Sequence, residues 1–220
     1  MAQEQFASVG PLAAGSATAI RTASSAPAGA IVLNGTLANA AGTVATMDNA
    51  RRILFTFAAD ETGHSFVITG TLAGGGAATE TVAGTTAGTV LSVLSYKTAS
   101  FTISATSTGN VSLGTTSTNG AESNWIQFDG YAKGGVAAQI SVSGTVNYTL
   151  QQTLDDPNRT DGYGRPVTSM TSVVWVNSAD SNVVAATGTQ QTNYAFPPRW
   201  VKILLNSGTG TVSGSFLQGG

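Results

Sequence analysis

Apolar and polar residues alternate with a period of two along most of the chain after residue 30. In residues 51–57 three apolar side chains fall on one face, an Asp-Glu-Thr-Gly turn follows, and residues 65–72 alternate again. Such alternation predicts half-buried β-strands. No apolar run with helical spacing reaches the length of a capped helix. The pattern therefore predicts an all-β protein.

The same pattern predicts further strands in both halves of the chain: residues 79–83, 89–95, 100–105, 110–113, 172–177, 183–186, 200–205 and 211–217. Residues 139–154 alternate without interruption, which corresponds to a strand of about 50 Å. A single strand of that length is unusual. We therefore expect either a bend near Gly144 or a strand that extends beyond its own sheet.

The two halves of the chain end in similar patterns. Residues 100–113 and residues 200–217 each alternate, break at a Thr-Gly step and alternate again. An alternating run, a short Gly turn and a second run are typical of a β-hairpin. Duplication of a small β-sandwich and convergence both account for the similarity.

The first 30 residues differ from the rest, because they are rich in Ala, Ser, Thr and Gly, alternate little and contain Pro11 and Pro27. We predict an extended N-terminal arm at residues 1–30, ordered against a neighbouring chain or its own domain, with a mobile tail as the alternative. Two small antiparallel β-sandwich or barrel-like domains follow, at residues 31–120 and 121–220.

The composition excludes several classes of function. Only 9% of the residues are charged, against about 25% in ordinary soluble domains, and the net charge is −2. Lys and Arg are scattered, whereas nucleic-acid binding requires clustered cations. The chain has no cysteine, which excludes disulfides and thiolate ligands. It has neither the apolar run of a membrane span nor the features of a secretory signal, so we expect assembly in the cytoplasm.

The residues suited to catalysis do not form a recognisable site. His64 is the only histidine, and Asp60, Glu61 and Ser65 crowd beside it in one predicted turn, where neighbouring side chains point apart. A nucleophilic triad needs an oriented base aimed at a hydroxyl, and no G-x-S-x-G motif is present. His64 is therefore interpreted as a polar turn residue, and we predict no catalytic residue.

Metal and cofactor motifs are also missing from the sequence. One histidine and no cysteine make a zinc site implausible, and the run of three glycines lacks the Lys-Ser/Thr step of a phosphate-binding loop. The loop from Asp155 to Asp161 is rich in oxygen ligands but lacks the spacing of an EF-hand, so calcium is the minor alternative to a solvated loop. We predict no cofactor and no metal.

Large aromatic residues concentrate in the second half and are predicted to form its core: Trp125, Phe128, Tyr131, Trp175, Tyr194, Phe196 and Trp200. One segment is the exception. Two adjacent prolines block regular strand pairing and are expected to present the flanking aromatics at a strand edge. The predicted partner contact comprises Tyr194, Phe196, Pro197, Pro198 and Trp200.

Several segments resemble β-domains of tailed-bacteriophage particle proteins. In the first half they are Ala50-Arg51-Arg52-Ile53, Phe66-Val67-Ile68-Thr69-Gly70-Thr71, Glu80-Thr81-Val82-Ala83-Gly84 and Thr108-Gly109-Asn110-Val111-Ser112. In the second half they are Gly144-Thr145-Val146-Asn147-Tyr148-Thr149-Leu150, Gln151-Gln152-Thr153-Leu154-Asp155-Asp156-Pro157, Ala195-Phe196-Pro197-Pro198 and Asn206-Ser207-Gly208-Thr209-Gly210. These motifs are compositional and centred on turns, so they indicate the group rather than a particular role within the particle.

This resemblance implies a non-enzymatic structural component of the virion, with no catalytic residue to carry over. Among virion roles, a capsid decoration (cement) protein or a neck–tail accessory protein is favoured. Such a protein is expected to form homo-oligomers and to contact capsid, neck or tail proteins, but neither nucleic acid nor membrane. A glycan-binding tail-fibre or receptor-binding module is the alternative, and a carbohydrate-active enzyme ranks third.

Overall fold

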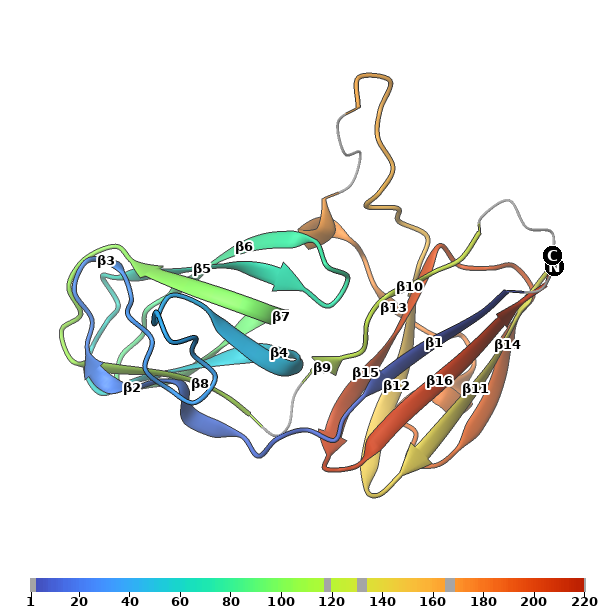
Figure 1. The fold of residues 1–220 in the computed structure, drawn as a ribbon, viewed down its shortest axis with the longest axis horizontal. Coiled ribbons are helices and arrows are strands. Elements are labelled where there is room, and N and C mark those ends of the chain that lie inside the picture. Colours follow the sequence, from blue (N-terminus) through green and yellow to red (C-terminus); the bar gives the residue numbers. More distant parts are fainter. Residues whose placement is uncertain (1–2, 117–119, 130–133, 165–168, 220) are drawn as a thin grey trace. The chain divides into compact units, whose positions relative to one another are not determined.

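Antiparallel strands form the whole framework of the protein, as the alternating pattern predicts. The structure is a computed structural model and describes residues 3–116, 120–129, 134–164 and 169–219. The chain divides into two compact units (Figure 1): residues 13–119, called the inserted unit, and residues 1–12 together with 120–220, called the split unit. Within the described residues, no helix has the length and apolar character needed to cross a membrane.

The inserted unit is built on one antiparallel sheet. Its strands are β2 (Ser16–Ser25), β3 (Gly29–Ala30), β4 (Ala45–Phe57), β5 (Ser65–Leu72), β6 (Ala77–Ala83), β7 (Gly88–Ile103) and β8 (Asn110–Thr115). They pair in the order β6-β5-β7-β4-β8-β2, and the short β3 also pairs with β7. The runs predicted separately at 89–95 and 100–105 are thus mainly one strand, β7, which pairs with β4 and β5.

Phenylalanines occupy the core of the inserted unit because alternation places them on one face. Phe55 packs edge-on against Phe66, with ring centroids 5.6 Å apart, and against Phe101 at 6.1 Å. Phe57 lies two residues further along β4 and contacts Phe66 at 5.0 Å. All four rings are buried. Such rings bury large apolar areas, so this cluster supplies much of the unit's hydrophobic stabilisation.

The split unit contains two sheets. Its strands are β1 (Gln3–Val9), β9 (Ala121–Glu122), β10 (Ile126–Gln127), β11 (Val136–Ser143), β12 (Val146–Thr153), β13 (Val176–Asn177), β14 (Gln190–Tyr194), β15 (Trp200–Gly208) and β16 (Thr211–Gln218). One sheet has the order β1-β16-β11-β14. In the other, β15 pairs with β12 on one side and with β9 and β10 on the other, and β13 pairs with β12.

A single core joins the two sheets of the split unit. Ile140 and Phe216 come from the first sheet, and Tyr148, Leu150 and Ile203 come from the second, all fully buried. Two short 3-10 helices, η1 (Met170–Ser172) and η2 (Ser181–Val183), each overlap one residue of the strands predicted at 172–177 and 183–186. The first of these strands forms only at Val176–Asn177, as β13, and the second is reduced to an isolated bridge at Ala186. The polar strand β14 was not predicted.

Two glycine corners carry the chain between these sheets. Strand β11 passes into β12 at Gly144 (φ +81°), and β15 passes into β16 just after Gly208 (φ +110°). The corners pack backbone against backbone, because the amides of Thr209 and Gly210 both donate to the carbonyl of Thr145 at 3.0 Å. The long alternating run 139–154 is therefore two strands in different sheets, with the bend at Gly144.

The predicted closing hairpins are wrong in both halves. Strands β7 and β8 do not pair with each other, because β4 lies between them. Strands β15 and β16 belong to different sheets. A Gly turn reverses the chain locally, but which strand pairs with which depends on the faces that must be buried together.

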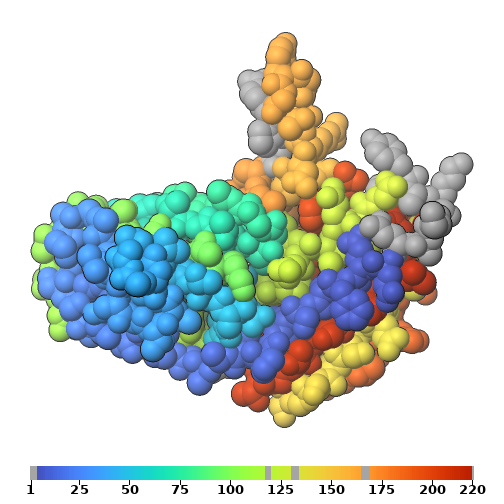
Figure 2. Space-filling view, viewed as in Figure 1, coloured from blue at the N-terminus to red at the C-terminus, as the bar shows by residue number. Residues whose placement is uncertain are grey.

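The N-terminal arm predicted at residues 1–30 is replaced by strands in both units. Strand β1 pairs along its whole length with β16, beside which it lies in Figure 2, and buries Ala7 and Val9 in the split unit. Strand β2 pairs with β8 and buries Ile20 in the inserted unit. The divisions fall after residues 12 and 119, so the second is close to the expected 120. In these first 30 residues the small side chains make the alternation of apolar and polar positions hard to recognise in the sequence. The same small side chains fit well into a tightly packed sheet.

Candidate functional site

The predicted partner contact at residues 194–200 does not form one exposed surface. Trp200 is only 6% exposed, Pro198 is buried, and Tyr194 packs against the core of the split unit. Pro197 is half-buried. Phe196 alone projects into solvent, with 89% of its surface exposed. The proline pair thus presents one aromatic ring rather than several.

The tryptophans form an internal cluster around a lysine. Trp125 contacts Trp175 at 4.9 Å and Trp200 at 6.4 Å between ring centroids. The Nζ atom of the buried Lys202 lies 4.5 Å from the Trp175 ring and 2.8 Å from Oε1 of Glu122. Burial lowers the pKa of Lys202 although Glu122 opposes that effect. Phe128 is also buried, whereas Tyr131 lies outside the described residues.

His64 takes part in a structural hydrogen-bond cluster rather than in a catalytic triad. Its Nδ1 lies 2.5 Å from Oε2 of Glu61, whose side chain is fully buried. The Glu61 carboxylate also accepts the backbone N–H groups of Gly109, at 2.8 Å, and Thr108, at 3.2 Å. Burial by itself would raise the pKa of Glu61, but these N–H groups and His64 hold it below its usual value. The carboxylate fastens the turn before β5 to the turn before β8.

The aspartates of the loop after β12 have separate partners. The side chain of Asp156 forms an ion pair with Arg199, with Oδ2 2.6 Å from Nη2. Asp155 accepts the backbone N–H of Val174 at 2.7 Å, and Asp161 accepts that of Tyr163 at 2.8 Å. Across residues 3–116, 120–129, 134–164 and 169–219, no three His, Asp or Glu side chains gather as metal ligands.

The buried charge of Arg21 is satisfied by backbone carbonyl groups. The guanidinium of Arg21 donates to the carbonyls of Val32 at 3.2 Å, Ser24 and Ser25 at 2.8 Å, and Val111. Burial lowers the pKa of Arg21. A charged group surrounded by carbonyls in this way joins chain segments and leaves little capacity for a substrate.

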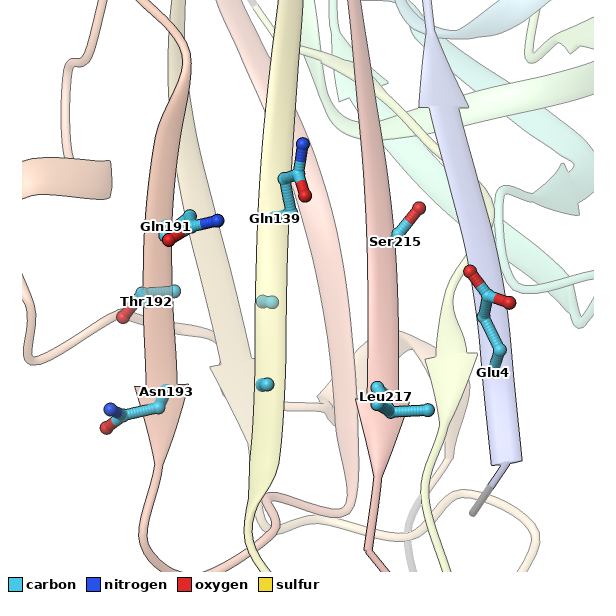
Figure 3. A pocket seen from close by; sticks show the side chains of 9 residues that line it. Glu4, Gln139, Gln191, Thr192, Asn193, Ser215 and Leu217 are labelled. Carbon is cyan, nitrogen blue, oxygen red and sulfur yellow. The ribbon is translucent and has the colours of Figure 1, made fainter.

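A groove lies on the outer face of the sheet β1-β16-β11-β14 (Figure 3) and is called the sheet groove. Its volume is about 470 Å³. It is lined by residues from all four strands: Glu4, Ala137, Ala138, Gln139, Gln191, Thr192, Asn193, Ser215 and Leu217. It lies entirely within the split unit.

Strand register arranges the outward side chains in rows across the sheet. One row runs Glu4, Leu217, Ala137, Asn193, and the next runs Phe6, Ser215, Gln139, Gln191. The alternate residues of the same strands, such as Ala7, Phe216 and Ile140, face the core. Polar outward and apolar inward positions therefore arise from one period-two pattern.

The sequence interpretation did not single out the sheet groove. The outward residues of β11 could be identified from its alternation, because Val136–Ser143 places Gln139 between buried positions. Strand β14 reads Gln-Gln-Thr-Asn-Tyr and carries no such apolar signal. The alignment of the four strands comes only from tertiary pairing.

Comparisons of the chain with protein-family models, with curated proteins and with solved structures find no match.

Proposed function

We propose that this chain is a non-enzymatic structural component of a tailed-bacteriophage particle, either a capsid decoration protein or a neck–tail accessory protein. The observation that supports this proposal most is the use of buried ionisable groups as cross-links. Glu61 joins two turns, Arg21 joins three segments, and Lys202 pairs with Glu122. Each group is held by neighbours within the fold, which favours durability over chemistry.

The proposed partners are further copies of the chain and other virion proteins. Exposed apolar residues supply a candidate contact at the base of the loop between β12 and β13, where Leu154 is 83% exposed and Val174 and Val176 are also exposed. The hydrogen bond from Val174 to Asp155 holds the two ends of this base together. In Figure 1 the described part of this loop that follows β12, residues 154–164, extends away from that strand. Apolar side chains exposed at one place favour a protein contact.

The test uses the purified full chain and particles of the parent phage that lack it. We expect a closed oligomer in light scattering and cosedimentation of the chain with these particles. Leu154→Asp combined with Val174→Asp should weaken cosedimentation at least ten-fold. Val93→Asp is the matched control, because Val93 is exposed in the inserted unit. If the unsubstituted chain does not cosediment with the particles, the proposed function is wrong.

The alternative, a glycan-binding tail-fibre or receptor-binding module, is favoured by the sheet groove. The aromatic segment at residues 194–200 offers little surface for stacking on sugar rings, since Trp200 is buried. The groove offers a different surface, formed by amide, hydroxyl and carboxylate side chains together with Ala137, Ala138 and Leu217.

A further inference from the structure

The sheet groove has the form of a trough. Its central strands, β16 and β11, carry the small outward residues Ser213, Ser215 and Ala137 beside the longer Gln139 and Leu217. The marginal strands carry longer ones, Glu4 and Phe6 on β1 and Gln191 and Asn193 on β14. Three strand spacings separate the margins by about 14 Å. The small residues of the central strands leave room for one extended chain along the strands, beside the side chains of Gln139 and Leu217.

The trough continues beyond the groove itself. A second hollow, of about 360 Å³, shares Ala137, Asn193 and Leu217 with the groove and reaches Gly135 and Gly219 at the end of the sheet. A continuous, shallow and open trough suits a polymer better than a compact small molecule, which binds in more enclosed pockets.

The polar groups of the trough are unused within the described structure. The amides of Gln139, Gln191 and Asn193 and the hydroxyl of Ser215 point outward and make no side-chain hydrogen bond to another described residue. In Figure 3 the Glu4 carboxylate lies over strand β1, which neighbours β16. An amide offers two donors and an acceptor together, and a carboxylate accepts at two oxygens. The vicinal hydroxyl groups of a sugar are complementary to both the amide and the carboxylate.

The exposed apolar residues and the charge of the groove further restrict the chemical class of ligand that it could bind. Phe6 is 65% exposed and stands opposite Ser215, and Leu217 is 48% exposed in the adjacent row. An exposed ring face can pack against the apolar face of a pyranose. Among the described residues that line the groove, Glu4 is the only charged one, so phosphate, sulfate and carboxylate groups meet no cation within this lining.

From these observations we propose that the sheet groove binds a neutral polysaccharide. The amides of Gln139, Gln191 and Asn193 and the carboxylate of Glu4 bond its hydroxyls, and Phe6 packs on a sugar ring. This inference deepens the alternative function, the glycan-binding module, and does not depend on the particle-assembly role.

The experiment is affinity electrophoresis of the full chain in native gels that contain dextran, laminarin, galactomannan or, as an anionic comparison, alginate. We expect retardation by at least one neutral polymer and none by alginate. Gln139→Ala and Asn193→Ala should each weaken binding about three- to ten-fold, as expected for one lost hydrogen bond. Glu4→Ala should weaken it similarly, whereas Glu4→Gln keeps an acceptor and should retain most of the affinity.

The control for Phe6→Ala is Phe196→Ala, since both rings are exposed in the split unit but only Phe6 stands beside a groove residue, Ser215, in the strand register. Binding should fall with the first substitution and persist with the second. Three results would overturn the inference: no retardation by any neutral polymer, stronger retardation by alginate, or groove variants that change the oligomeric state while binding stays intact. The cosedimentation assay with depleted particles is read separately, so failure of one proposal leaves the other standing.

Discussion

The two units of the chain reach stability by different routes. The inserted unit is one continuous segment, residues 13–119, whose strands β2 to β8 pair with one another. The split unit needs both ends of the chain, because β1 and β11 flank β16 in its first sheet. A continuous segment can complete its sheet with fewer distant contacts. The split unit cannot be complete until the last strand of the chain meets the first.

The hydrophobic cores of the two units also differ in how they are assembled. The inserted unit relies on a phenylalanine cluster within one sheet, and the split unit relies on two sheets that face each other across glycine corners. All three tryptophans lie in the split unit. Tryptophan fluorescence therefore reports on the split unit alone, which makes the comparison between the units measurable.

The largest expected effect comes from removing β1. Deletion of residues 1–9 takes a whole edge strand from the first sheet and leaves the core positions of Ala7 and Val9 empty. We expect the split unit to lose its fixed structure, with tryptophan emission shifted to that of the unfolded chain. The inserted unit should still unfold as one cooperative transition in circular dichroism.

A synthetic peptide of residues 1–12 supplies the control for this deletion. Added in excess, it should restore the native tryptophan emission by pairing with β16. Native emission from the truncated chain without peptide would show that the split unit does not depend on the N-terminus.

The glycine corners give the next largest effect. A Cβ atom on Gly210 would lie 2.3 Å from the carbonyl oxygen of Ser143, in the backbone of the opposing corner. Gly210→Ala should destabilise the split unit by about 3 kcal/mol, because neither backbone segment can move freely. Urea unfolding followed by tryptophan fluorescence measures the change.

Gly162→Ala is the matched control for the corner, since a Cβ at Gly162 meets nothing within 4 Å. Its unfolding midpoint should stay close to that of the unsubstituted chain. Equal midpoints for Gly210→Ala and Gly162→Ala would exclude close packing of the corners.

The smallest effect concerns the hydrogen bonds of the Glu61 carboxylate in the inserted unit. Glu61→Gln removes a carboxylate that accepts from two backbone amides and contacts His64, and should cost about 1–2 kcal/mol. The folded pKa of Glu61 lies below its unfolded value of about 4.3. Its stabilisation is therefore complete above the unfolded pKa and is lost as the pH falls through the folded pKa.

Thermal unfolding monitored by circular dichroism between pH 7 and pH 3 tests this dependence. The transition of the inserted unit should lose less stability on acidification in Glu61→Gln than in the unsubstituted chain. The tryptophan-detected transition of the split unit serves as the internal reference, and a difference confined to that transition would contradict the assignment.

Sequence patterns predicted local structure far better than pairing. Strand β5 begins and ends where alternation places it, at Ser65 and Leu72, because a period of two directly records which side chains face the core. Strand β1 escaped prediction because its buried residues include the small Ala7, and β14 because it is polar. Glu61 was correctly placed in a turn, but its burial depends on Gly109, 48 residues away.

The sequence by itself determined that the protein is all-β and that its single histidine lies in a turn, and it left a bend near Gly144 as one of two possibilities. Only the tertiary structure decided that the chain's two ends share a sheet, that the apparent hairpins are not hairpins, and that Glu4, Gln139, Gln191 and Ser215 line one groove. The physical reason is the distance along the chain over which each effect acts. Alternation and turn chemistry act over a few residues, whereas strand pairing is selected by burial across the whole chain.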